Sequence, residues 1–129
     1  MLCLIMMKKI TGTELVLNSE LIGNQPIKIK LSGHRAYNCM GSATWWEYNW
    51  YFSFCHNNQN YILLYNSCIQ GEGWFLEETH TAKLNVTSSI VFQNVRDRVK
   101  GKWSYVELLS DHATIDKILG DRPRHCRGY

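Results

Sequence analysis

The stretch TWWEYNWYFSF, residues 44–54, decides the predicted fold, because aromatic side chains recur at every second position from Trp46 onward. Successive side chains of a β-strand point to opposite faces, so a period of two is typical of a strand. A helix would scatter the same rings around its circumference, and aromatic residues favour a pleated surface. The stretch therefore predicts a strand whose aromatic face carries five residues: Trp46, Tyr48, Trp50, Phe52 and Phe54.

An aromatic row on a sheet is also found where proteins stack unpaired nucleic-acid bases. Such platforms need cations beside the rings, whereas residues 44–66 contain no Lys or Arg. We therefore interpret the aromatic face as part of the hydrophobic core.

Length and composition indicate one globular domain spanning residues 1–129. The chain is 45% hydrophobic and 19% charged, which is unlike a disordered or fibrous protein. Its five cysteines are an odd number without paired spacing, so we expect reduced thiols and a cytoplasmic location. The N-terminus lacks the pattern of a targeting or membrane segment. Residues 1–6 are interpreted as an extension and residues 121–129 as a basic tail.

Further strands are expected on both sides of the aromatic stretch, at residues 15–17, 27–31, 61–65, 74–76 and 102–109. The strand at 61–65 is apolar on both faces and is expected to lie centrally. In the strand at 102–109, one face is expected to carry Trp103, Tyr105 and Glu107, and the other face Val106 and Leu108. Turn-forming residues occupy 56–60 and 70–73. Ser32, Gly33 and His34 are expected to end the strand at 27–31, and residues 35–43 are left as a short helix or loop.

Two segments near the C-terminus have helical signals. Residues 86–100 fit either a helix or a strand, and the valines that recur every four residues favour the helix. A closing helix is expected between a cap at Ser110 or Asp111 and a stop at Gly120. Together these elements predict an α+β fold, with a twisted antiparallel or mixed sheet of about five or six strands and one or two helices packed on its aromatic face.

An acidic segment with two aromatic residues, GEGWFLEE at residues 71–78, is the first candidate for a partner-binding site. Aromatic anchors provide affinity at protein interfaces, and charges at the rim provide orientation and association rate. Such a segment suits a basic protein partner, for example a nuclease. The predicted partner-binding residues are Glu72, Trp74, Glu77 and Glu78.

A basic surface near the C-terminus supports an alternative, a nucleic-acid-associated factor. Clustered Lys and Arg side chains attract phosphate groups, and binding of this kind weakens steeply with salt. The candidate residues for an anion or nucleic-acid patch are Arg96, Arg98, Lys100, Lys102, Arg122, Arg124 and Arg127.

Catalytic and metal-binding patterns are weaker. A cysteine hydrolase built on Cys39 and His56 lacks an identifiable residue to orient the histidine, and remains the lesser alternative. Structural zinc sites normally show paired ligands two to four residues apart. The Cys and His residues that could bind metal lack this pairing: Cys55, His56, Cys68, His80, His112, His125 and Cys126. We therefore expect no enzymatic activity, cofactor or metal.

Residues 49–119 resemble immunity proteins of bacterial contact-dependent inhibition and related polymorphic-toxin systems. The resemblance rests on the order of features: an Asn-Trp-Tyr-Phe strand from Asn49, a strand ending at Asn66, and a Phe-Leu-Glu-Glu run from Phe75. A helix, a Trp-containing strand and a closing helix follow. The resemblance implies a small cytosolic α+β protein without catalytic activity that occludes one cognate toxin.

Overall fold

Strand β4 (Trp46–His56) contains the aromatic stretch and leads through a tight hairpin into β5 (Gln59–Cys68). The turn consists of Asn57 and Asn58, both with the positive φ that a two-residue type I′ turn requires. The computed structural model describes residues 6–9, 12–41, 46–68, 71–79 and 103–120. The predicted aromatic strand and the turn in residues 56–60 are confirmed.

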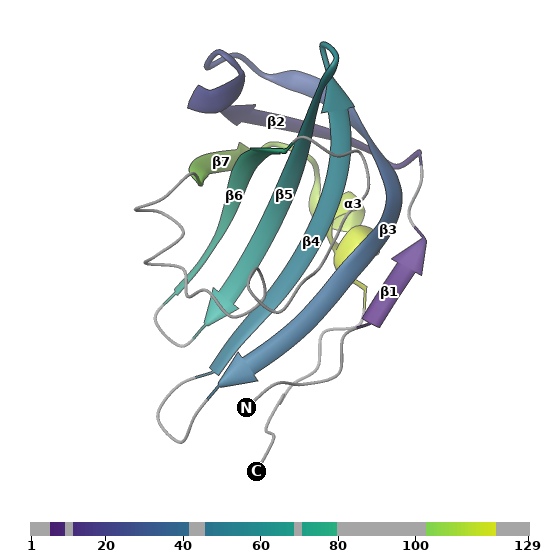
Figure 1. The fold of residues 1–129 in the computed structure, drawn as a ribbon, viewed down its shortest axis with the longest axis vertical. Helices are drawn as coiled ribbons and strands as arrows, with labels where there is room; N and C mark the ends of the chain where they lie inside the picture. The colour runs from purple at the N-terminus through teal and green to yellow at the C-terminus, as the bar shows by residue number, and fades with distance from the viewer. Residues whose placement is uncertain (1–5, 10–11, 42–45, 69–70, 80–102, 121–129) are drawn as a thin grey trace.

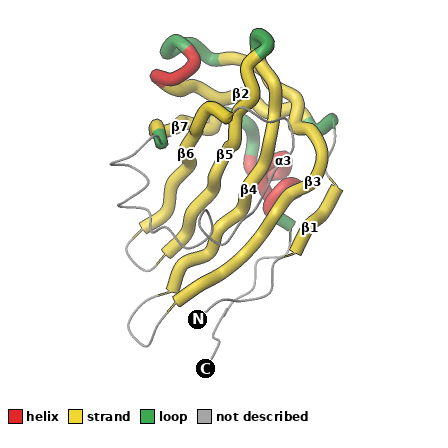
Figure 2. Tube along the Cα trace, viewed as in Figure 1, coloured by secondary structure: helices red, strands yellow, loops and turns green. Residues whose placement is uncertain are grey.

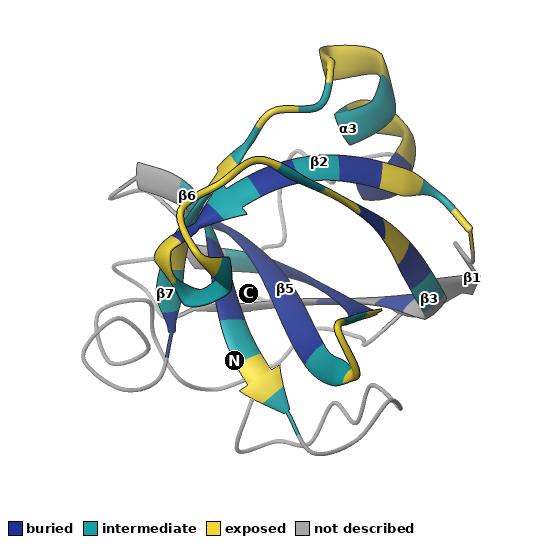
Figure 3. Ribbon diagram, turned by 90° about the horizontal axis from the view of Figure 1, so that it is seen from above, coloured by how far each residue is buried: buried dark blue, intermediate teal, exposed yellow. Residues whose placement is uncertain are grey.

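Six antiparallel strands close into a barrel. In Figure 1, the strands β3 to β6 form a curved sheet, while β2 and β7 cross behind it. From above, the strands form a ring (Figure 3), and Figure 2 shows that strands dominate the domain. The order around the barrel is β3 (Ile27–Gly41), β2 (Glu14–Ser19), β7 (Ser104–Leu108), β6 (Gly71–Thr79), β5 and β4, and β4 pairs with β3 again.

The α+β prediction is confirmed in part. The sheet is antiparallel, and a helix packs against its aromatic face. The domain is mostly β, however, and its sheet closes on itself, which the sequence pattern did not indicate. The predicted helical segment at residues 86–100 lies outside the described residues.

Strand β3 is longer than predicted and bends at residues 32–36. Its first part pairs with β2 and its later part with β1 (Met6–Lys9), while its other edge pairs with β4 from Leu31 to Gly41. The register with β4 shifts between Ser32 and Ala36, as at a β-bulge. The expected strand end at residues 32–34 is therefore wrong, and residues 35–41 are strand rather than helix or loop.

The inner face of the barrel holds an aromatic row in which four rings lie in register across four neighbouring strands. The ring centroids are 4.9 Å apart between Tyr37 and Trp50, 5.3 Å between Trp50 and Tyr65, and 4.6 Å between Tyr65 and Trp74. Aromatic pairs at such distances stabilise beyond the area they bury. This cross-strand row consists of Tyr37, Trp50, Tyr65 and Trp74. The predicted aromatic core is confirmed for Tyr48, Trp50, Phe52 and Phe54, whereas the Trp46 side chain lies outside what the structure describes.

The outer face of β4 and β5 is buried as well. Tyr51 and Leu64 alternate with the inward-facing residues and are 0% exposed. Two asparagines on this face form a buried pair, in which Asn66 Nδ2 donates to Asn49 Oδ1 at 2.7 Å. The prediction that β5 lies centrally and is covered on both faces is confirmed.

The closing helix α3 (His112–Leu119) begins and ends as predicted. The Asp111 carboxylate accepts a hydrogen bond from the Thr114 backbone N–H. Hydrogen bonding to Thr114, first through its side chain and then through this N–H, holds the pKa of Asp111 below its usual range. Gly120 forms the C-cap with φ 67°. Ile118 and Leu119 join the barrel core. Within the described part of the chain, no helix is long and apolar enough to cross a membrane.

A buried arginine holds the C-terminus of α3 against the barrel. Arg35, on β3, donates hydrogen bonds from its guanidinium to the backbone carbonyls of Ile118 and Leu119. The indole of Trp50 donates to the same Leu119 carbonyl at 3.2 Å. A cation at a helix C-terminus is favourable because the unpaired carbonyls there carry partial negative charge. The helix is thus tied to the aromatic row.

Strands β6 and β7 complete the ring and carry the surface described below. The prediction for β6 was too short, because residues 71–73 belong to the strand rather than to a turn. The face assignment for β7 is confirmed, since Val106 and Leu108 pack against the core while Tyr105 and Glu107 point outward.

Candidate protein-binding surface

The predicted partner-binding residues lie on β6, where successive side chains point to opposite faces of the sheet. Trp74 belongs to the inner aromatic row, whereas Glu77 lies on the outer face and is half-buried. Glu78 is exposed beside Tyr61; burial first, and then this carboxylate, raises the pKa of the Tyr61 phenol. Of Glu72 the structure describes only the backbone. Strand alternation therefore prevents Trp74 and Glu77 from sharing one face, and partner binding by this set stays a prediction.

The basic patch lies wholly outside the described residues, so its role in anion or nucleic-acid binding also stays a prediction. Its members there are Arg96, Arg98, Lys100, Lys102, Arg122, Arg124 and Arg127.

The two residues of the cysteine-hydrolase alternative do not meet in the barrel. Cys39 on β3 is paired with Tyr48 on β4, and His56 lies eight residues further along that strand. At about 3.3 Å per residue, this corresponds to roughly 26 Å along β4. A histidine must lie within hydrogen-bond reach of a thiol to activate it.

The metal candidates are scattered in the same way. Cys55 and His56 lie at the end of β4, Cys68 at the end of β5, and His112 at the start of α3. Within the described ranges, no three or more His, Cys, Asp or Glu residues come together as a metal site. His80, His125 and Cys126 lie outside these ranges.

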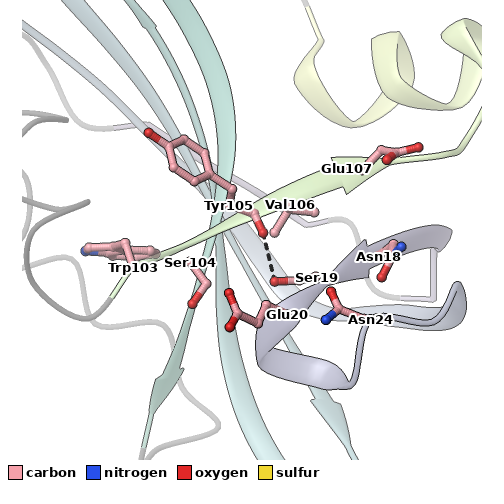
Figure 4. A pocket seen from close by; sticks show the side chains of 9 residues that line it. All are labelled: Asn18, Ser19, Glu20, Asn24, Trp103, Ser104, Tyr105, Val106 and Glu107. Atoms are coloured by element: carbon pink, nitrogen blue, oxygen red, sulfur yellow. Dashed lines mark hydrogen bonds between the residues drawn. The ribbon is translucent and has the colours of Figure 1, made fainter.

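A hollow lies between β7 and the short 3-10 helix η1 (Glu20–Ile22), with a volume of about 520 Å³. Figure 4 shows the nine side chains that line it, which come from the end of β2, from η1 and its following turn, and from β7. Ligand-binding hollows in proteins commonly fall between about 300 and 1,000 Å³. This one is large enough to receive a side chain of a partner.

The Ser19 hydroxyl makes hydrogen bonds to both sides of the hollow. Its hydroxyl accepts a hydrogen bond from the Leu21 backbone N–H and donates one to the Tyr105 carbonyl at 2.8 Å (Figure 4). The chain then turns back through Gly23 and Asn24, both with positive φ, a conformation that these two residue types tolerate. The hydroxyl therefore links η1 to β7 and holds the two elements next to each other.

The outer face of β7 and the residue after it expose two large hydrophobic side chains. Tyr105 is 66% exposed and Leu109 is 41% exposed, and these are the exposed large hydrophobics among the described residues. Glu107 lies between them on the same face and is also exposed. The Tyr105 ring packs against the ring of Phe75 on β6, with ring centroids 5.2 Å apart. We call Tyr105, Glu107 and Leu109 the β7 face.

The hollow beside the β7 face is acidic. Among its described lining residues, Glu20 and Glu107 carry carboxylates and none is Lys or Arg. The Oδ1 atom of Asn18 is enclosed there and has no hydrogen-bond partner within the described chain. The two carboxylates give this part of the described surface a negative charge, although the formal net charge of the chain is +3.

Sequence reasoning placed the acidic and aromatic surface on residues 71–78 and missed the β7 face. The alternation of Trp103, Tyr105 and Glu107 was visible and correctly predicted which side chains share a face. Exposure was not visible: Trp103 is buried, whereas Tyr105, two residues later on the same face, is open to solvent. The contribution of η1 had no sequence signal, because it depends on the pairing of β2 with β7.

Comparison with known proteins adds no relative. The chain matches no protein-family model, no curated protein and no solved structure. The functional argument therefore rests on the residues and their arrangement.

Proposed function

We propose that this protein is a cytosolic, non-enzymatic protein-binding module, an immunity protein that neutralises a cognate toxin by occluding it. The observation that carries the proposal is the β7 face, where an exposed aromatic ring and an exposed aliphatic side chain flank a carboxylate. Aromatic residues are enriched among the few side chains that provide most of the binding energy at protein interfaces.

The position of the β7 face supports its use as a docking surface. Val106 and Leu108 pack against the barrel core, so the outward-facing side chains stand on a rigid strand. Tyr105 is further held by Phe75 and by the hydrogen bond between its carbonyl and Ser19. A preorganised surface loses little conformational entropy on binding, which favours affinity.

The local charge supports a basic partner. Glu107 lies on the same face as the exposed ring, Glu77 of the predicted segment lies on the same outer face of the sheet one strand away, and Glu20 lines the hollow next to β7. At physiological salt, charges are screened beyond about 8 Å, so among the described residues these carboxylates are the charges that a partner docking here meets first. A basic toxin such as a nuclease has the complementary character.

A growth-protection assay tests the proposal. The product of the gene directly upstream is expressed in a bacterial host, alone and together with this protein. We expect growth arrest in the first case and restored growth in the second, with a complex that survives purification. The variant Tyr105→Ala/Leu109→Ala should lose protection, because truncation of an anchoring side chain weakens binding by about 2 kcal/mol or more.

Two controls accompany the assay. Tyr105→Phe keeps the ring and should still protect, and Lys30→Ala alters an exposed residue of β3 away from the β7 face. An upstream product without toxicity, or turnover of a substrate by the purified protein, would contradict the proposed function. Full protection by the double variant would show that the partner docks elsewhere.

A further inference from the structure

The closing helix α3 is not part of the hydrogen-bonded ring of the barrel. The described strands pair around the ring without it, from β3 through β2, β7, β6 and β5 to β4 and back to β3. In Figure 1, α3 lies behind β3 and β4. Its described contacts with the barrel come from apolar side chains and from the backbone carbonyls of its last turn. The pairing of the strands is therefore complete whether or not α3 is in place.

The C-terminal end of α3 provides most of its attachment to the barrel. Ile118 and Leu119 are its buried residues, Ile115 is partly buried against the core, and most of the others are exposed. The helix has eight residues, whereas isolated helices shorter than about 12–15 residues are marginal in water. Elements with few buried apolar side chains open at a lower free-energy cost than core strands. The helical state of α3 therefore depends on the docking of its last turn.

The polar part of this attachment comes from two strands. The Arg35 guanidinium on β3 donates to the carbonyls of Ile118 and Leu119, and the Trp50 indole on β4 donates to the Leu119 carbonyl. Arg35 is 7% exposed and Trp50 is 2% exposed, so these hydrogen bonds are closed off from solvent. Because they share the acceptors of one helix turn, they break together when that turn leaves.

The chain just before α3 is fixed to the barrel separately. The Leu109 backbone N–H donates to the Val16 carbonyl, and the Val16 N–H donates to the Ser110 hydroxyl oxygen at 2.8 Å. These bonds belong to β2 and remain when α3 moves. Release of the helix can therefore be confined to the residues after Ser110.

We infer that α3 is a latch, a helix that detaches as one unit from a barrel whose strands stay paired. Release withdraws the carbonyl acceptors from Arg35 and Trp50 and opens the part of the inner face where Trp50 packs against Tyr37. The loss of burial of Ile118 and Leu119 keeps the open state a minor one. In that state a cation and an indole N–H become accessible beside aromatic rings, a combination that the closed protein hides.

Hydrogen exchange of the full-length protein, followed by NMR, tests the inference. Trp50 carries two reporters, because its backbone N–H belongs to a strand paired on both sides and its indole N–H bonds to the Leu119 carbonyl. We expect the indole N–H and the amides of residues 115–120 to exchange through one shared opening. After correction for intrinsic rates, this opening should be at least about a hundredfold more frequent than the one that releases the Trp50 backbone N–H. Equal protection of the two Trp50 groups would overturn the inference, because α3 would then open only with the whole barrel.

Two glycine variants separate the latch from the barrel. Gly120→Ala places a Cβ atom 2.6 Å from an Arg35 guanidinium nitrogen, so it disturbs the closed contact. It should raise the exchange of the Trp50 indole N–H and of the α3 amides about tenfold. The matched control Gly12→Ala also has positive φ but meets no atom within 4 Å. Its strain is the same with α3 docked or released, so exchange at the latch should keep the wild-type rate. Faster latch exchange in Gly12→Ala, or unchanged latch exchange in Gly120→Ala, would overturn the inference.

Discussion

The inner face of the barrel and the β7 face are built from similar residues but use them differently. Inside, the Arg35 guanidinium donates hydrogen bonds to the carbonyls at the end of α3, and the indole of Trp50 in the aromatic row donates to one of the same carbonyls. On the β7 face, Tyr105 and Glu107 are exposed side by side on one strand, and no charged partner for Glu107 lies among the residues that line the neighbouring hollow. The interior thus satisfies its charge within the chain, whereas the surface presents charge to whatever docks there.

This difference teaches that an aromatic and charged combination does not by itself mark a binding site. Trp74 was predicted to bind a partner because acidic residues surround it in sequence, yet it belongs to the inner row. Tyr105, with a single acidic neighbour two residues away, is the exposed ring. Substitutions on the two surfaces should therefore separate stability from binding.

The largest effect is expected for Trp50→Ala, in the middle of the aromatic row. The substitution leaves a cavity beside Tyr37 and Tyr65 and removes the hydrogen bond to the Leu119 carbonyl. We expect the free energy of unfolding to fall by about 3–5 kcal/mol, as measured by urea denaturation. A loss below about 1 kcal/mol would show that the row is not the centre of the core.

Gly120→Ala should have the next largest effect, because it disturbs the contact between α3 and Arg35. Gly120 has φ 67° and ψ −159°, a region that is essentially restricted to glycine, and a Cβ atom would lie 2.6 Å from an Arg35 guanidinium nitrogen. We expect a loss of about 1–3 kcal/mol in unfolding free energy.

The matched control is Gly12→Ala, which has positive φ but no atom within 4 Å of the new Cβ. It isolates the conformational cost and should be the milder change. Equal losses of unfolding free energy for the two variants would mean that the Arg35 side chain moves aside at no energetic cost.

Tyr37→Phe is expected to leave stability nearly unchanged although Tyr37 lies in the same row as Trp50. Its hydroxyl is buried and has no hydrogen-bond partner among the described residues, so removing it should change the unfolding free energy by at most about 1 kcal/mol. A larger loss would reveal a partner for the hydroxyl.

The same variant makes a prediction about pH. Burial raises the pKa of the Tyr37 phenol above its ordinary value of 10.0. The group is therefore neutral in both states at low pH, and stability is lost as the pH rises above the unfolded value, where the unfolded chain ionises first. Denaturation between about pH 8 and pH 11 should show a shallower loss for Tyr37→Phe than for the wild type.

A small change in stability is also expected for Tyr105→Ala. The ring is mostly exposed and its described ring contact is the cross-strand pair with Phe75, so the loss should be about 0.2–1 kcal/mol. The same substitution should remove most of the affinity for the partner. A stability loss comparable with that of Trp50→Ala would erase the distinction between the two surfaces.

The elements with local signals were predictable from the sequence. The alternation in residues 44–54, the Asn57-Asn58 turn, and the cap and stop of α3 each arise within a few residues, since dihedral preferences and side-chain periods act locally. The bend in β3 was not predictable, because Ser32, Gly33 and His34 are read locally as a strand end. Pairing with β1, β2 and β4 carries the strand past them.

By itself, the sequence determined that residues 44–54 and 61–65 form a hairpin of strands, that one face of β4 belongs to the core, and that Tyr105 and Glu107 share a face. Only the tertiary structure decided that the sheet closes, that Trp74 turns inward, and that η1 stands beside β7 to form the hollow. Closure and burial depend on contacts between residues far apart in the chain, such as Ser19 with Tyr105 and Arg35 with Leu119. No local pattern encodes which of two chemically similar rings will be covered by such contacts.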